Sequence, residues 1–225
     1  MNHIDRVVCQ VHFPPVLSIG KEITKIQERI IKDYPLYQLA PAVTGPNGMP
    51  LPKTHIFANK ERCWEVTISI SSVSSVTTRY TGWKEMKERL DFIISTLDDM
   101  FEIPGTYRIG LRFINAIRPS KLKDNSIQVL SDTFNNIVPE GNKFFSITLN
   151  NIWDENICSN SEISRIVFTD GENDEGFLVD NDVYSEIDLP FLEIKNQVEK
   201  LHVKSRELFA RYTTENLQRE VGYHD

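Results

Sequence analysis

The stretch Tyr107–Pro119 reads Tyr-Arg-Ile-Gly-Leu-Arg-Phe-Ile-Asn-Ala-Ile-Arg-Pro and is the most regularly patterned part of the chain. Its apolar and arginine side chains alternate with the period of two that is typical of a half-buried strand. The apolar face contains Tyr107, Ile109, Leu111, Phe113 and Ile117. The opposite face contains Arg108, Arg112 and Arg118. Asn115 falls on the apolar face, so its amide must bond to backbone or water, or lie where burial stops.

The segments before this strand predict a ferredoxin-like order of elements. An alternating stretch at 6–13 predicts a first strand, and isoleucines at helical spacing predict a helix that ends near 33–35. Strands at 64–70 and 73–80 form an expected hairpin, and a helix with Thr81 as its N-cap runs to about 101. Residues 1–119 therefore have the βαββαβ order of a ferredoxin-like fold.

The segment from Leu39 to Lys60 interrupts this order, because its prolines and glycines are too closely spaced for a regular element. These residues are Pro41, Gly45, Pro46, Gly48, Pro50 and Pro52. We expect a long, mobile surface loop here, which is either functional or merely tolerated.

Residues 120–225 predict an antiparallel β segment followed by a long C-terminal helix. Strands are expected at 122–130, 144–150, 163–169 and 177–187. The last two form an acidic hairpin, because no basic residue lies between Arg165 and Lys195. The helix begins at Asp188-Leu189-Pro190 and has apolar residues at three- and four-residue steps as far as Tyr212. Neither a linker nor a repeat separates this part from 1–119, so the sequence predicts one α+β unit over 1–225.

Composition limits the classes of function. The 225 residues have a net charge of −7, which argues against a general nucleic-acid binder, although a local basic patch leaves nucleic acid open. The sequence has no run of eighteen apolar residues and no signal-peptide layout, so we expect a cytoplasmic protein without a membrane segment. Cys9, Cys63 and Cys158 are widely spaced and predict neither a disulfide framework nor a zinc site.

The usual catalytic and metal-binding motifs are missing from the sequence. It has no phosphate loop, dinucleotide fingerprint, nucleophile elbow or His-Glu-x-x-His motif, and its five histidines are scattered. The acidic residues at 170–175 lack the order of a calcium loop, so they predict a solvated turn. We therefore expect no catalytic residue, no metal site and no cofactor.

The candidate binding residues lie on the sheet face that the two helices of a ferredoxin-like fold leave open. That face would present Arg6, Gln10, His12, Arg108 and Arg112, with Thr77 and Arg79 close by. Of these, Gln10, His12, Arg79, Arg108 and Arg112 are the predicted ligand- or partner-binding residues. Guanidinium groups on a rigid sheet suit an anion or phosphate, and an imidazole at His12 would suit proton transfer. The alternative is that the acidic second half pairs with these arginines internally.

Several short motifs carry a resemblance that spans nearly the whole chain. They are Val-Val-Cys-Gln-Val-His-Phe-Pro-Pro at 7–15, Gln27, Tyr34-Pro35, Tyr80-x-x-Trp83, the strand Arg108–Asn115, and Phe209-x-x-x-Thr213. The chain resembles a sporadically distributed, uncharacterised family of bacterial and archaeal proteins marked by an Arg-Ile-Gly-Leu-Arg-Tyr-Ile-Asn-like strand. Phe113 departs from that motif by one hydroxyl. The resemblance implies no enzyme activity, and its patchy distribution is typical of accessory genes on mobile or defence islands.

These observations favour a non-enzymatic protein-interaction component of a microbial (antiviral) defence or toxin–antitoxin-type system. Its expected partner is another protein or a second copy of itself. The alternative is a binder or processor of an anionic ligand or RNA through the arginine-bearing face. An enzyme has the least support, because no catalytic constellation is present.

Overall fold

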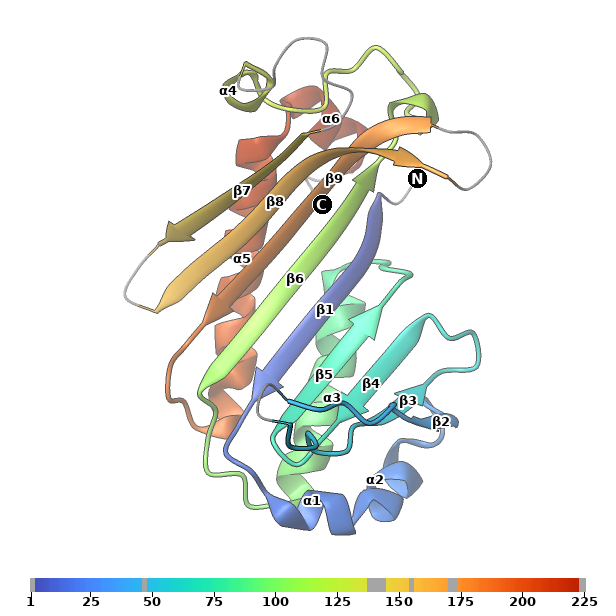
Figure 1. The fold of residues 1–225 in the computed structure, drawn as a ribbon, viewed down its shortest axis with the longest axis vertical. Coiled ribbons are helices and arrows are strands. Elements are labelled where there is room, and N and C mark those ends of the chain that lie inside the picture. The colour runs from blue at the N-terminus through green and yellow to red at the C-terminus, as the bar shows by residue number, and fades with distance from the viewer. Residues whose placement is uncertain (1–2, 46–47, 137–144, 154–155, 170–173, 223–225) are drawn as a thin grey trace. The chain divides into compact units, whose positions relative to one another are not determined.

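The computed structural model describes residues 3–45, 48–136, 145–153, 156–169 and 174–222. These residues form nine strands in one sheet, in the order β2-β3-β4-β5-β1-β6-β9-β8-β7 (Figure 1). The strands are β1 (Ile4–His12), β2 (Leu36–Leu39), β3 (His55–Ala58), β4 (Trp64–Ile68), β5 (Ser72–Thr77), β6 (Arg108–Ile117), β7 (Phe145–Ile152), β8 (Ile157–Phe168) and β9 (Asp174–Ser185).

Six α-helices are named within the described residues, and they confirm the predicted α+β class. They are α1 (Leu17–Lys21), α2 (Ile23–Ile30), α3 (Trp83–Met100), α4 (Asp132–Asn135), α5 (Ile194–Tyr212) and α6 (Glu215–Glu220). Two 3-10 turns, η1 (Pro119–Lys121) and η2 (Phe191–Glu193), complete the elements. No helix in the described part of the chain is both long enough and apolar enough to span a membrane.

Contacts divide the chain into two compact units whose segments interleave in the sequence. Unit 1 consists of Met1–Val7, Leu111–Tyr184 and Glu199–Asp225. Unit 2 consists of Val8–Gly110 and Ser185–Val198. In unit 2, α3 buries one stripe that includes Met86, Leu90 and Ile94. In unit 1, the α5 residue His202 packs against Phe113 of β6, with ring centroids 6.1 Å apart.

The β6 strand has the alternation that its sequence predicts. Ile109, Leu111 and Ile117 are completely buried, and Arg112 on the opposite face is exposed. The Asn115 amide donates a hydrogen bond of 3.0 Å to the carbonyl oxygen of Val179, which confirms the expected backbone partner. Tyr107 is the exception: it precedes the strand and is 46 % exposed, so its prediction as a core residue is wrong.

The segment predicted as a loop at 39–60 is one only in part: the described residues of 40–54 contain no named helix or strand apart from the isolated Thr44–Pro50 bridge, but Leu39 and 55–58 belong to β2 and β3. Its base is β2 paired antiparallel with β3, and the pairing continues outward through hydrogen bonds from Ala40 N to Thr54 O and from Leu51 N to Val43 O. Gly45 N also donates to Met49 O. We call residues 36–58, apart from 46 and 47, the arm.

Two further predictions are wrong at the level of single elements. The α3 helix begins at Trp83 with Gly82 as its N-cap, and the Thr81 hydroxyl instead donates to the Glu85 carboxylate. The segment 122–130 forms no strand, and Leu130 makes only an isolated bridge to Thr213. Apolar residues there are buried without a strand partner, so their burial does not require a sheet.

The second half otherwise follows its predicted order. β8 and β9 are neighbours in the sheet and are longer than the two strands expected for the acidic hairpin. The turn predicted at 170–175 is wrong for Asp174 and Glu175, which belong to β9, and its remaining residues, 170–173, lie outside the described residues. The strand expected at 144–150 is described from Phe145 onward as β7. The predicted helix start at Asp188-Leu189-Pro190 is wrong, because Leu189 makes an isolated bridge to Thr106, Phe191–Glu193 form η2 and α5 begins at Ile194. The predicted apolar residues are buried, namely Phe191 in η2 and Ile194, Val198, Leu201, Leu208, Phe209 and Tyr212 in α5.

Candidate functional site

The arm in unit 2 is built from a short, ordered base and an outward extension. The Tyr37 hydroxyl lies 3.0 Å from Nδ1 of His55, and the two rings stack with centroids 6.0 Å apart. Tyr37 also contacts Phe57, its partner in the β2–β3 register, at 5.4 Å between ring centroids. Cross-strand ring pairs of this kind stabilise a two-stranded ribbon. The arm is therefore held as a hairpin by its own side chains as well as by its backbone.

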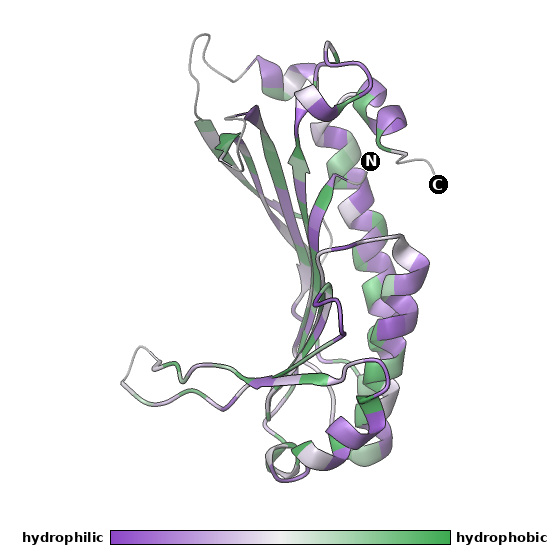
Figure 2. Cartoon of the chain, turned by 90° about the vertical axis from the view of Figure 1, so that its right-hand side faces the viewer, coloured by the Kyte–Doolittle hydropathy of each residue, from purple (hydrophilic) through white to green (hydrophobic). Residues whose placement is uncertain are grey.

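Large apolar side chains are exposed along the arm. They are Tyr37 (47 %), Leu39 (45 %), Val43 (57 %), Met49 (71 %) and Leu51 (51 %). Figure 2 shows the arm as a long, thin hairpin with apolar stretches on both of its strands. The sequence from 36 to 58 contains Lys53 and His55 but no acidic residue, in a chain whose net charge is −7. This apolar, acid-free surface differs from the charged surface of an ordinary solvated loop.

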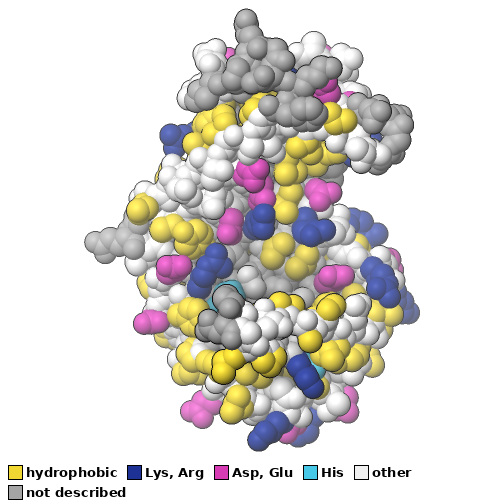
Figure 3. Space-filling view, viewed as in Figure 1, with side chains coloured by type: hydrophobic (Ala, Val, Ile, Leu, Met, Phe, Trp, Pro, Cys, Tyr) yellow, Lys and Arg dark blue, Asp and Glu magenta, His cyan; other side chains and the backbone are white. Residues whose placement is uncertain are grey.

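A second candidate surface lies in unit 1, on the face of β6 and β9. The sequence predicted a binding surface there because of the arginines of β6. Arg112 donates from Nε to Oδ1 of Asp180 at 2.8 Å and from its terminal nitrogen to Oδ2 at 2.5 Å. This two-point bond raises the pKa of Arg112. Figure 3 shows acidic and basic side chains next to each other on this face of the unit. The alternative prediction, that the acidic second half pairs internally with the arginines, is thus confirmed for Arg112.

The two substitutions that break the Arg112–Asp180 pair are expected to lower the free energy of unfolding by different amounts. The Arg112 side chain is 49 % exposed, whereas that of Asp180 is only 10 % exposed. Arg112→Met leaves a nearly buried carboxylate without its partner, and we expect a loss of about 1–2 kcal/mol in the free energy of unfolding. Asp180→Asn leaves a half-exposed guanidinium that water can solvate, so we expect a loss of less than about 1 kcal/mol. Urea unfolding of both variants measures the difference, and equal losses would contradict it.

His12 and Arg108 come together in unit 2, as predicted. The His12 ring lies 6.0 Å from that of Tyr107, and the His12 carbonyl accepts a hydrogen bond of 3.1 Å from the Tyr107 amide. Burial, and then the charge of Arg108, lowers the pKa of His12, so its imidazole is neutral at pH 7. Gln10 lies two residues earlier on β1 and is half-buried. This group offers hydrogen bonds and a cation, but its described residues include no nucleophile that His12 activates.

Arg79 and Thr77 are not on the face to which the sequence assigned them. Thr77 lies opposite the buried Trp64 in the β4–β5 register, and its hydroxyl donates to the Cys63 carbonyl at 3.0 Å. Arg79 follows β5. The pKa of Glu85 in α3 is lowered first by the hydrogen bond from Thr81, and the positive charge of Arg79 contributes to this shift. The Trp64 ring is covered by Arg89 of the same helix at 4.6 Å. Thr77 therefore points into the core, and Arg79 is associated with the start of α3.

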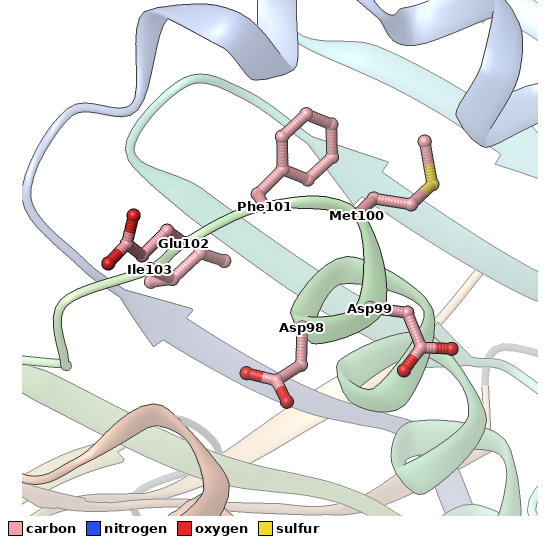
Figure 4. Close-up of a pocket in the computed structure, with 6 residues that line it drawn as sticks. All are labelled: Asp98, Asp99, Met100, Phe101, Glu102 and Ile103. Carbon is pink, nitrogen blue, oxygen red and sulfur yellow. The ribbon is translucent and has the colours of Figure 1, made fainter.

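A shallow hollow of about 410 Å³ lies at the C-terminal end of α3 in unit 2 (Figure 4). Its lining includes Asp98, Asp99 and Glu102, with Phe101 and Ile103 beside them. Asp99 lies 3.5 Å from Arg29, a pair in which both side chains are more than half exposed. Among the residues that the structure describes, no group of three or more His, Cys, Asp or Glu side chains is placed to hold a metal ion. The hollow is thus an acidic feature of the surface of unit 2.

The arm is the part of the candidate site that the sequence prediction missed. A proline- and glycine-rich segment predicts a loop, but four large apolar residues between Leu39 and Leu51 and the lack of acidic residues were signals of an exposed binding element. Comparison with known proteins gives no further guide, because no protein-family model and no curated protein matches this chain.

Proposed function

We propose that this chain is a non-enzymatic protein-interaction component and that it binds its partner protein through the arm. One observation carries the proposal: five of the twelve large hydrophobic residues that are exposed within the described chain lie between Tyr37 and Leu51. Apolar side chains scattered singly over a surface need no explanation, whereas a concentration of them marks an interaction site. A partner that covers this segment would remove the apolar surface from water.

The composition of the arm supports a protein as the partner. Aromatic residues and methionine are enriched in the centres of protein interfaces, and Tyr37 and Met49 are both exposed on the arm. Its backbone pairing reduces the entropy lost when the arm is ordered on binding. The expected partner presents an apolar groove, because the arm offers only Lys53 and His55 for charge-based recognition. We place this activity in a microbial defence or toxin–antitoxin-type system, in line with the family that the sequence resembles.

The finer fold assignment concerns the part of the chain that carries the arm. We infer a ferredoxin-like βαββαβ unit from β1, α2, β4, β5, α3 and β6, to which the arm is added between α2 and β4. The spatial order β4-β5-β1-β6 supports this assignment, since the first strand lies between the third and the fourth. We also infer a cytoplasmic location, which is supported by three free cysteines, two of them buried.

An anionic ligand or RNA on the arginine-bearing face is the second proposal. It is favoured by the neutral His12 imidazole beside Arg108, which could accept a hydrogen bond next to a cation. The engagement of Arg112 by Asp180 weakens it, because an incoming anion would have to displace a carboxylate held at two points. Thermal stabilisation by oligonucleotides or nucleotides that decreases with salt would support this second proposal.

The test of the arm compares two triple variants with similar losses of exposed apolar surface. The arm variant is Val43→Ser, Met49→Ser and Leu51→Ser; the control is Leu17→Ser, Leu192→Ser and Val203→Ser, at positions that are 68 %, 59 % and 50 % exposed. The partner is first identified by affinity capture at natural expression level and then purified. We expect the arm variant to weaken binding by about tenfold or more and the control to bind like wild type. Equal affinities for all three proteins would overturn the proposal.

A further inference from the structure

Within the part of the chain that the structure describes, the strand β7 is an edge of the sheet in unit 1 that is neither short nor charged. It is the last strand in the sheet order, it spans eight residues, and its sequence Phe-Ser-Ile-Thr-Leu-Asn-Asn-Ile has no charge, proline or glycine. Edge strands are normally short or protected by charges, prolines or bulges, because their free N–H and C=O groups can pair with another strand. The opposite edge, β2, follows this rule, since it spans only four residues, with Pro35 directly before it and Pro41 two residues after it.

The side chains of β7 that lie on the core side of the sheet form a row that is only half-buried. Phe145, Ile147 and Leu149 alternate with exposed polar residues, and each of the three is half-buried. Ile147 lies opposite Ile163 of β8, which is completely buried, so the row continues the core face of the sheet. Phe145 contacts Phe177 of β9 at 6.4 Å between ring centroids. The apolar layer of unit 1 thus extends to the edge strand and becomes less buried there.

We propose that two copies of this chain form a dimer by antiparallel pairing of their β7 strands. A second copy supplies an apolar row of the same kind and length, and an uncharged strand meets its own copy without like-charge repulsion. A twofold axis uses the one long edge of each copy, so the assembly stops at two chains. The pairing would satisfy the edge hydrogen-bonding groups and cover the half-buried row at the same time.

The symmetry restricts the register of this pairing. If the core faces of both copies lie on the same side of the joined sheet, residues directly opposite each other must belong to the same row. A twofold axis at Thr148 satisfies this condition and pairs the whole span 145–151. It places Thr148 opposite the partner subunit's Thr148, and Ile147 opposite the partner subunit's Leu149. Thr148 is exposed on the row away from the core, so it can be substituted without changing the core.

Disulfide trapping tests this register directly. In a Cys158→Ser background, Thr148→Cys would place two thiols opposite each other across the axis, within the reach of a disulfide. The matched control is Asn150→Cys on the same exposed row, where the two thiols would be about 13 Å apart along the strands. We expect mild oxidation to link most of the Thr148→Cys chains and few of the Asn150→Cys chains. Equal linkage of both variants, or linkage of the control alone, would contradict the register.

A charge substitution tests the dimer without any cross-link. Thr148 lies opposite Glu162 within its own chain, so Thr148→Lys adds a favourable pair to the folded monomer. Across the twofold axis, however, two lysines would face each other. In analytical ultracentrifugation we expect a dimer for wild type and for Thr148→Ser, and a dimer dissociation constant raised about tenfold or more for Thr148→Lys. A wild-type monomer at all concentrations, or a dimer that Thr148→Lys leaves unchanged, would overturn the proposal.

Discussion

Leu111→Ala is expected to lower the free energy of unfolding by about 3 kcal/mol. Leu111 is completely buried in β6, and its side chain belongs to the apolar face of the strand. Alanine removes three carbon atoms, one methine and two methyl groups, from this layer and leaves a cavity that neighbouring side chains fill only in part. Urea unfolding, followed by circular dichroism, measures the loss as a lower transition midpoint with an unchanged slope.

The control for this prediction lies three residues further along the same strand. Ile114 is half-buried on the opposite face, so Ile114→Ala removes a similar apolar group from a surface that water already reaches. We expect a loss of about 1 kcal/mol or less. If the two substitutions cost the same, or if Ile114→Ala costs more, the assignment of the core face of β6 is wrong.

Acidification is expected to destabilise the protein through His202. This side chain is 9 % exposed on α5, and burial lowers its pKa from the ordinary value of 6.5 to about 4, with Glu199 and Arg206 acting in opposite directions. The unfolded chain therefore takes up the proton first as the pH falls. The stability that depends on neutral His202 is complete above pH 6.5, decreases between 6.5 and 4, and changes no further below 4. We expect a loss of about 2 kcal/mol between pH 7 and pH 5.

His202→Gln isolates this contribution from that of other titrating groups. Burial also lowers the pKa values of His3, His12 and His55, so the wild-type pH dependence alone does not identify the residue. The measurement is the unfolding free energy of both proteins at several values between pH 7 and pH 4. We expect a smaller pH dependence for the variant. Parallel curves for the two proteins would show that His202 is not the source.

The sequence predicts those elements whose buried residues follow a regular spacing along the chain. The alternation in β6 and the apolar stripe of α5 each require one face to be covered, and that requirement is visible from residue spacing alone. The same reasoning misplaced Tyr107, because alternation does not show where a strand ends. It also missed the hairpin of the arm, because proline and glycine weaken a strand without excluding one at an edge. Thr81 is a good N-cap by type, but its hydroxyl has an alternative acceptor in Glu85.

The candidate sites depend on contacts between distant residues, which spacing alone does not give. Arg112 and Asp180 are 68 positions apart, and their pairing depends on β6 and β9 being neighbours in the sheet. The sequence could predict an arginine-bearing face and an acidic segment, but not which carboxylate reaches which guanidinium. Thr77 was misplaced for a related reason, since the register with Trp64 decides which face it occupies.

Amide hydrogen exchange of the chain, free and bound to its purified partner, tests the role of the arm most directly. The measurement follows the segments 40–54 and 108–112, which report on the arm and on the arginine-bearing face. We predict that the partner slows exchange at 40–54, including the hydrogen-bonded amides of Gly45 and Leu51, and leaves 108–112 unchanged. Protection confined to 108–112, with the arm exchanging as it does in the free chain, would contradict the proposed function.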